Sequence, residues 1–147
     1  MEFDYTVTTR KTFDEAVQAV QSEIAQAGMR VLYVHDVQKT LGEKGFTREP
    51  FKIIEFCNAQ FANEFLNIDI KIGLCIPCKI NVYVKDGPAS ASDFAKASSD
   101  KKASAGKHVF ISGMRPIILH QFFPQADFGK KPKEIDHLIQ TIINNAK

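Results

Sequence analysis

Several common features are absent from this sequence. No run of apolar residues approaches the roughly 20 that a membrane-spanning helix needs. The segment Met1 to Tyr5 contains acidic residues and no apolar stretch, unlike a secretory signal. Neither sign of charge is in excess, since 19 Lys and Arg stand against 17 Asp and Glu, whereas nucleic-acid binders concentrate basic residues. These absences predict a cytoplasmic protein with neither a membrane nor a nucleic acid as partner.

Cysteine is also scarce, and familiar catalytic motifs are missing. Three cysteines without a repeating framework suit a reducing compartment better than a disulfide-stapled secreted fold. The sequence contains no phosphate-binding loop, no glycine-rich dinucleotide motif, no paired-histidine zinc motif and no nucleophile elbow. It therefore indicates no particular cofactor and no standard reaction.

The length and composition predict one globular domain over residues 1–147. A chain of 147 residues with 44% hydrophobic and 24% charged residues is long enough to bury one substantial core. Between Gly87 and Lys107 the sequence is mostly Ala, Ser, Lys and Asp with almost no apolar residue. We expect a flexible low-complexity insertion at about 87–107, which links two antiparallel strands.

The N-terminal part predicts a strand, a helix and a second strand. Tyr5 to Arg10 is rich in residues that favour strands. Thr12 and Glu15 have the spacing of a capping box, which starts a helix, and Gly28 supplies its left-handed stop. Residues 29–34 then form the second strand.

The middle of the chain predicts two more strands and two helices. Asp36 caps a short helix, and Asn58 caps a longer one. Phe51 to Cys57 is nearly continuous in apolar residues, which predicts a central strand covered on both faces. From Ile76 to Lys85 apolar and polar residues alternate, as in a strand with one buried face.

The C-terminal part predicts a last strand and two helices. His108 to Ser112 resumes a strand, and Pro116 starts a short helix, unless the strand continues there. Pro132 opens a helix whose apolar stripe must cover the sheet or a partner subunit. This order predicts an α+β fold, a two-layer sandwich with a partly antiparallel sheet and helices on one face.

Cys57 and Asn58 form the first candidate site. Cys57 ends the predicted strand immediately before the N-terminus of a helix, where free amides and the helix dipole would favour its thiolate. Such a sulfur suits a nucleophile or a metal ligand. The alternative is a buried cysteine that acts as a small apolar residue of the core.

The segment Cys75-Ile76-Pro77-Cys78 has the C-x-x-C spacing of redox and metal sites. Here it leads into a strand, whereas in thioredoxin-like sites it leads into a helix. Side chains three apart on a continuous strand point to opposite faces, so Cys75 and Cys78 meet only if Pro77 lies in a turn or bulge. By this parity Cys78 shares the buried face of Ile80, and Cys75 points the other way.

A structural zinc site would need a fourth ligand besides the three cysteines. The sequence contains no closely spaced histidine pair. The candidates for the additional ligand are single histidines: His35, His108, His120 and His137.

The segment Phe56-Cys57-Asn58-Ala59-Gln60-Phe61-Ala62, followed by Gly73-Leu74-Cys75-Ile76-Pro77-Cys78, resembles the domain of unknown function 302 family. That family shows a C-N-x-x-x-A helix start and a G-L-x-x-P-C strand start. The resemblance extends over nearly the whole chain except the insertion. The family cysteines match Cys57 and Cys78, while Cys75 stands where an aliphatic residue is usual and Ala59 where a proline is usual.

The resemblance implies a small two-layer α+β fold, similar to a half-repeat of the TATA-binding protein with added helices. It also implies assembly as a homodimer, and no established activity. Three functions remain open. The leading hypothesis is a homodimer that binds a small ligand or a protein partner near Cys57 and Cys78. The alternatives are a sulfur-handling or redox protein that uses Cys57 with Cys78, and a metal or haem binder that uses cysteine and histidine.

Overall fold

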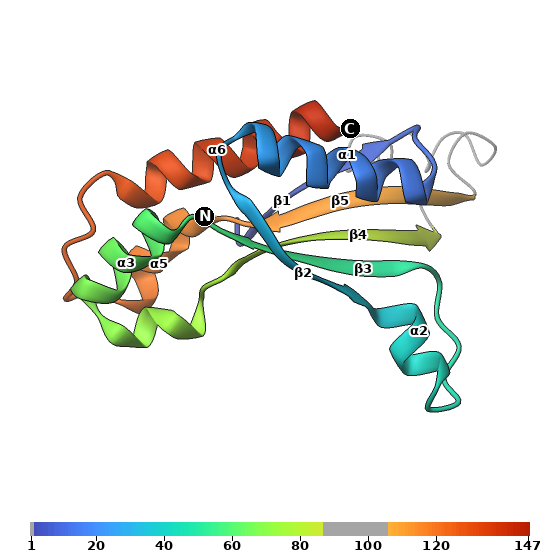
Figure 1. Ribbon diagram of the computed structural model, residues 1–147, viewed down its shortest axis with the longest axis horizontal. Helices are drawn as coiled ribbons and strands as arrows, with labels where there is room; N and C mark the ends of the chain where they lie inside the picture. Colours follow the sequence, from blue (N-terminus) through green and yellow to red (C-terminus); the bar gives the residue numbers. More distant parts are fainter. Residues whose placement is uncertain (1, 87–105) are drawn as a thin grey trace, which may run out of the picture.

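A computed structural model describes residues 2–86 and 106–147 of the chain (Figure 1). Most of the predicted insertion at about 87–107 lies outside the described residues, and Lys107 begins a strand. The predicted order of elements is confirmed. In chain order these are β1 Asp4–Thr9, α1 Phe13–Gln26, β2 Arg30–Asp36, α2 Val37–Gly42, β3 Phe51–Cys57, α3 Ala59–Ile68, the 3-10 helix η1 Ile70–Leu74, β4 Cys78–Asp86, β5 Lys107–Met114, the 3-10 helix η2 Pro116–Ile118, α5 Leu119–Phe122 and α6 Lys131–Ala146.

The strands form a single five-stranded sheet in the order β1-β5-β4-β3-β2, and every neighbouring pair is antiparallel. The α+β class with helices on one face is confirmed, and the sheet of the described residues is wholly antiparallel. The prediction that Phe51–Cys57 is central and covered on both faces is wrong. The central strand is β4, and in β3 the buried Ile54 and Phe56 alternate with half-buried Ile53 and Glu55. A run of apolar residues does not tell whether a helix or a row of neighbouring side chains covers it.

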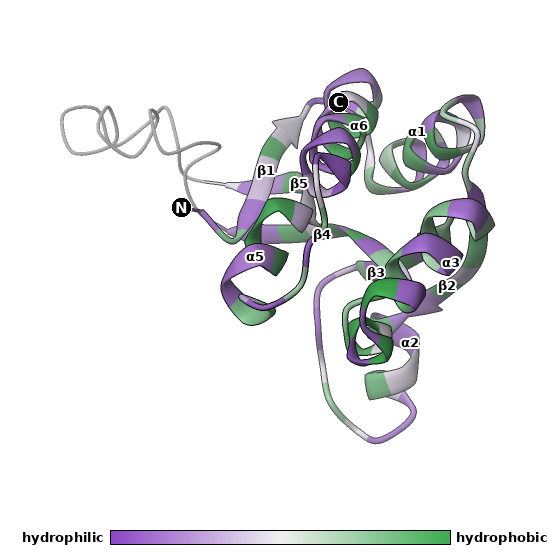
Figure 2. Cartoon of the chain, turned by 90° about the vertical axis from the view of Figure 1, so that its left-hand side faces the viewer, coloured by the Kyte–Doolittle hydropathy of each residue, from purple (hydrophilic) through white to green (hydrophobic). Residues whose placement is uncertain are grey.

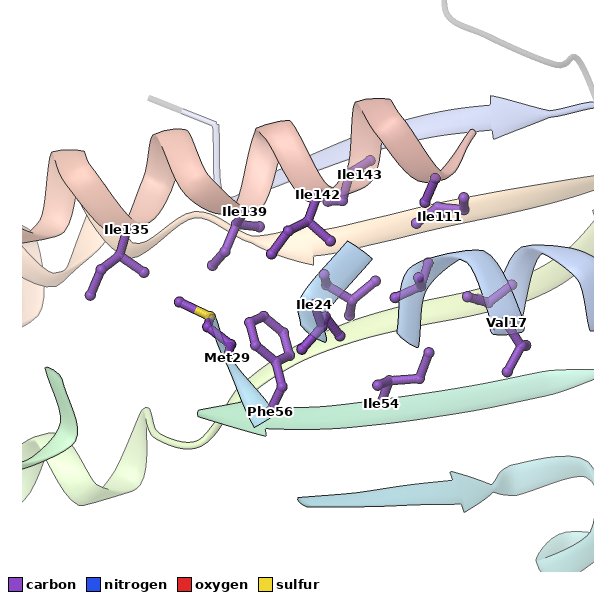
Figure 3. Packing of buried hydrophobic residues seen from close by; sticks show 14 of the residues in the cluster. Val17, Ile24, Met29, Ile54, Phe56, Ile111, Ile135, Ile139, Ile142 and Ile143 are labelled. Atoms are coloured by element: carbon purple, nitrogen blue, oxygen red, sulfur yellow. The ribbon is translucent and has the colours of Figure 1, made fainter. Parts of the chain in front are cut away.

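Helices α1 and α6 form the second layer. They lie side by side over the same face of the sheet (Figure 2). The capping box of Thr12 and Glu15 starts α1 as predicted, and Gly28 takes the left-handed φ of 75° just after it. The isoleucines of α6 point into the core together with Ile24 and Phe56 (Figure 3). The apolar stripe of α6 therefore covers the sheet, one of the two predicted possibilities.

The contact between α6 and β5 depends on a glycine. A Cβ atom added to the buried Gly113 would stand 2.9 Å from Cδ1 of Ile143 and 3.0 Å from Cγ2 of Ile139. Both distances are shorter than ordinary van der Waals contacts. The absence of a side chain at Gly113 therefore lets the helix approach the strand.

An ion pair joins the end of β5 to α6. Nε of Arg115 donates to Oδ1 of Asp136 at 3.1 Å, and Nη2 donates to Oδ2 at 2.9 Å. The Asp136 side chain is only 7% exposed, and Gln140 donates a further hydrogen bond to Oδ2 at 2.7 Å. This two-pronged geometry orients the first half of α6 against the end of the sheet.

The opposite face of the sheet, called here the uncovered face, lies away from α1 and α6. Helix α2 contacts it at the side of β2 and β3, where Val37, Thr40 and Leu41 line a groove with Ile53 and Glu55. A row of stacked aromatic rings crosses three neighbouring strands on the same face. The ring centroids of Phe51 and Tyr83 lie 5.7 Å apart, and those of Tyr83 and Phe110 lie 5.4 Å apart. All three side chains are half-buried. None of the helices in the described part of the chain is long and apolar enough to cross a membrane.

Candidate functional site

Four of the five residues predicted to form a site, Cys57, Asn58, Cys75 and Cys78, line one pocket at one end of the sheet, and Pro77 does not. Its lining includes the end of β3, the start of β4 and part of α3. It is small, with a cavity volume of roughly 30 Å³. Its walls are almost entirely apolar. The lining residues are Met29, Cys57, Asn58, Phe61, Ala62, Phe65, Cys75, Ile76, Cys78, Met114, Pro116, Leu119 and Ile135.

Cys57 stands at the helix start as predicted, but its thiolate is not favoured there. The side-chain oxygen of Asn58 accepts hydrogen bonds from the amides of Gln60 at 2.9 Å and Phe61 at 3.1 Å. Because the Asn58 side chain occupies these amides, they are not free to stabilise a sulfur anion. Burial raises the pKa of the Cys57 thiol, although a hydrogen bond with the backbone of Asn58 acts in the opposite direction. The expected activation of Cys57 is therefore wrong.

Cys75 and Cys78 line the same pocket, contrary to the prediction that they face opposite ways. A turn at Cys75 and a bend at Pro77 precede β4, so strand parity does not apply to this segment. The Ile76–Pro77 peptide bond is cis. Burial raises the pKa of Cys78 to about 12; Cys57 and Cys75 also raise it, while Lys79 lowers it.

The structure gives no support to a conventional zinc site. All three cysteines are free thiols, and none of the four histidines lines the pocket. Within residues 2–86 and 106–147 no group of three or more His, Cys, Asp and Glu side chains could hold a metal ion. The alternative of a metal or haem held by cysteine and histidine therefore lacks a ligand set in the described part of the chain.

The sequence analysis missed two pocket residues, Met29 and Met114. Met29 directly precedes β2, and Met114 is the last residue of β5. Figure 3 shows the Met29 side chain beside Phe56 and Ile135. Their positions at strand ends were the one sequence feature that could have pointed to these two methionines. The strand order needed to place these ends together is a tertiary fact.

The raised pKa values predict slow, strongly pH-dependent thiol alkylation. Four pH units below a pKa of about 12, only about one Cys78 thiol in ten thousand is ionised, and the thiolate is the reactive form. At pH 8 we expect iodoacetamide to modify Cys78 far more slowly in the folded protein than in urea. Peptide mass spectrometry of timed samples measures both rates. Equal rates in the folded and unfolded chain would contradict the prediction.

The raised pKa of Cys78 also makes the stability of the fold depend on pH. The folded state keeps the Cys78 proton up to a pH of about 12, whereas an unfolded thiol loses it near 9.0. The folded state thus binds more protons in this range, and stability falls as the pH rises from about 9.0 towards 12.

Comparison with known proteins identifies the family of the chain. A crystal structure of an uncharacterized conserved DUF302 protein from Bacillus stearothermophilus is similar over 100% of both chains, with 23% sequence identity and a TM-score of 0.78. This similarity shows the fold. No curated protein matches the sequence. The family model for the domain of unknown function DUF302 matches residues 5–93, more than half of the chain. The chain therefore belongs to the DUF302 family.

Proposed function

We propose that this protein is a non-catalytic binding domain that works as a homodimer, with two copies joined through their uncovered faces. The observation that carries this proposal is the aromatic row of Phe51, Tyr83 and Phe110, which crosses the face of the sheet opposite α1 and α6. Aromatic side chains are enriched at the centres of protein interfaces. Ile53 lies beside the row and adds further apolar surface.

The charges around the aromatic row suit a second copy of the chain. By strand parity Asp4 and Glu55 share the uncovered face with Lys79 and Lys85. In a two-fold symmetric dimer the same surface of both copies is in contact. Because this surface carries both signs of charge, acidic residues of one copy can face basic residues of the other. The homodimer that the sequence resemblance implies supports the choice of a second copy as the partner.

A binding domain fits the cysteine pocket better than a thiol enzyme does. A nucleophilic cysteine needs a lowered pKa, whereas burial raises the pKa of both Cys57 and Cys78. Pockets for organic ligands enclose about 300 Å³ or more, which is far above the roughly 30 Å³ found here. A ligand at the predicted site near Cys57 and Cys78 must therefore be very small.

Sedimentation velocity over a range of protein concentrations tests the dimer. We expect Tyr83→Glu to raise the dissociation constant at least about 30-fold, because it places a charge at the centre of the interface in both copies. The matched control is Phe122→Glu, which changes a 64% exposed phenylalanine on α5. A monomeric wild type would overturn the proposal, as would a dimer that only the control variant weakens.

A further inference from the structure

The groove beside α2 is a second hollow of the fold, on the uncovered face of the sheet. Helix α2 packs against β3 there, on the side of the sheet opposite α1 and α6 (Figure 1). The groove has a volume of roughly 250 Å³, a little below that of pockets for drug-sized ligands. It therefore suits a smaller molecule. The lining residues are His35, Val37, Thr40, Leu41, Ile53, Glu55 and Lys79.

Glu55 and Lys79 place opposite charges next to each other in the groove. The two residues pair directly across β3 and β4, and the side chains of such a pair lie on the same face with Cβ atoms about 5 Å apart. Oε1 of Glu55 lies 3.1 Å from Nε2 of His35, and Nζ of Lys79 donates to the carbonyl of Pro77 at 3.4 Å. A carboxylate has about four acceptor sites and an ammonium about three donors, so both groups keep capacity for a ligand.

The remainder of the groove is mostly aliphatic. Val37 and Leu41 lie one turn apart on α2, so their side chains point from the same face of the helix. Ile53 stands two residues before Glu55 on β3 and points to the same face of the sheet. These three side chains, called here the apolar wall, line the groove together. A carboxylate, an ammonium and an aliphatic surface therefore border one small volume.

We propose that this groove binds one free aliphatic α-amino acid, such as leucine. The α-ammonium of the ligand donates to the Glu55 carboxylate, and its α-carboxylate accepts from the Lys79 ammonium. The side chain of the ligand lies against the apolar wall. Charge-assisted hydrogen bonds are about twice as strong as neutral ones, and an amino acid forms one with each groove charge. A ligand with a single charge leaves either Glu55 or Lys79 without such a contact, so charge complementarity favours the zwitterion.

The amino-acid site does not rest on the proposed homodimer. All of its lining residues belong to one chain. The aromatic row lies towards the other end of β3, because Phe51 and Glu55 are four residues apart and a strand rises about 3.3 Å per residue. Failure of leucine to bind would leave the sedimentation result unchanged, and a monomeric protein would still bind leucine.

Isothermal titration calorimetry of the full chain with L-leucine tests the proposal. We expect one site per chain with a Kd below about 1 mM. Leucine amide lacks the carboxylate and 4-methylpentanoate lacks the ammonium, and each should bind at least about tenfold more weakly. Glycine lacks the aliphatic side chain and should also bind at least about tenfold more weakly. No saturable binding of leucine up to about 10 mM, or equal affinity for any of these three analogues, would overturn the proposal.

Two variants assign the groove residues. Lys79→Gln and Glu55→Gln each remove one charge at nearly constant size, and each should weaken leucine binding at least about tenfold. In Lys79→Gln the preference for leucine over leucine amide should disappear, and in Glu55→Gln the preference over 4-methylpentanoate. Lys85→Gln is the matched control, since Lys85 lies on the same strand and face but outside the groove. Unchanged affinity in both groove variants, or an equal loss in the control, would overturn the site.

Discussion

Replacement of Arg115 with alanine is expected to lower the free energy of unfolding by about 3 kcal/mol. The change removes both hydrogen bonds that the guanidinium donates to the Asp136 carboxylate. Of the three hydrogen bonds described for that carboxylate, only the one from Gln140 then remains. Because the Asp136 side chain is 7% exposed, water cannot readily replace the lost partner. Urea unfolding at neutral pH measures the difference.

A double variant separates the loss of the ion pair from the loss of packing. In Arg115→Met with Asp136→Leu both charges are gone and apolar side chains fill the space. Such replacements of a buried pair are often neutral or stabilising, so we expect the double variant to be more stable than Arg115→Ala. If the two variants were equally destabilised, the unpaired Asp136 carboxylate would not be the cause.

The second large effect is expected at Gly113. In Gly113→Ala the new methyl group would meet Ile143 at 2.9 Å and Ile139 at 3.0 Å, so α6 or these side chains must move. Overpacking of this kind costs about 2 kcal/mol in the free energy of unfolding. The melting temperature and urea unfolding of the purified variant measure the loss.

Two further variants test the cause of this loss. Ile143→Val removes Cδ1, the atom that stands closest to the added methyl group, and alone costs about 1 kcal/mol. Combined with Gly113→Ala it should cost less than the sum of the single changes, because the clash is relieved. Gly73→Ala is the matched control, since its Cβ would meet Leu66 at an ordinary 3.7 Å. Additive losses, or a large loss at Gly73, would contradict the packing argument.

Local signals in the sequence were enough to predict most of the fold. The capping box of Thr12 and Glu15, the Asn58 cap and the isoleucine stripe of α6 each determine a helix within a few residues of its observed bounds. The lateral order of the strands was not predictable in this way. The apolar run of β3 predicted burial on both faces, but a row of aromatic side chains partly covers the face opposite α1 and α6.

The candidate site was likewise predictable from local sequence in its residues but not in their surroundings. The sequence indicated Cys57, Asn58, Cys75, Pro77 and Cys78, and the structure brings all except Pro77 into the lining of one pocket. The chemistry of the thiols depended on distant residues, because the apolar walls that raise the pKa of Cys78 come from several elements. Met29 and Met114 were missed because only the pairing of strands places them there.

The position of the first strand determines when the fold can be completed. Thr9 of β1 pairs with Val109 of β5, one hundred positions later in the sequence. Strands β2, β3 and β4 follow one another as neighbours and can pair while the chain is being synthesised. A pairing between distant segments forms slowly, and the unpaired edge is prone to aggregation until it does. On the ribosome β1 therefore stays without its partner until β5 has emerged, and the helix that packs against both strands, α6, emerges later than β5.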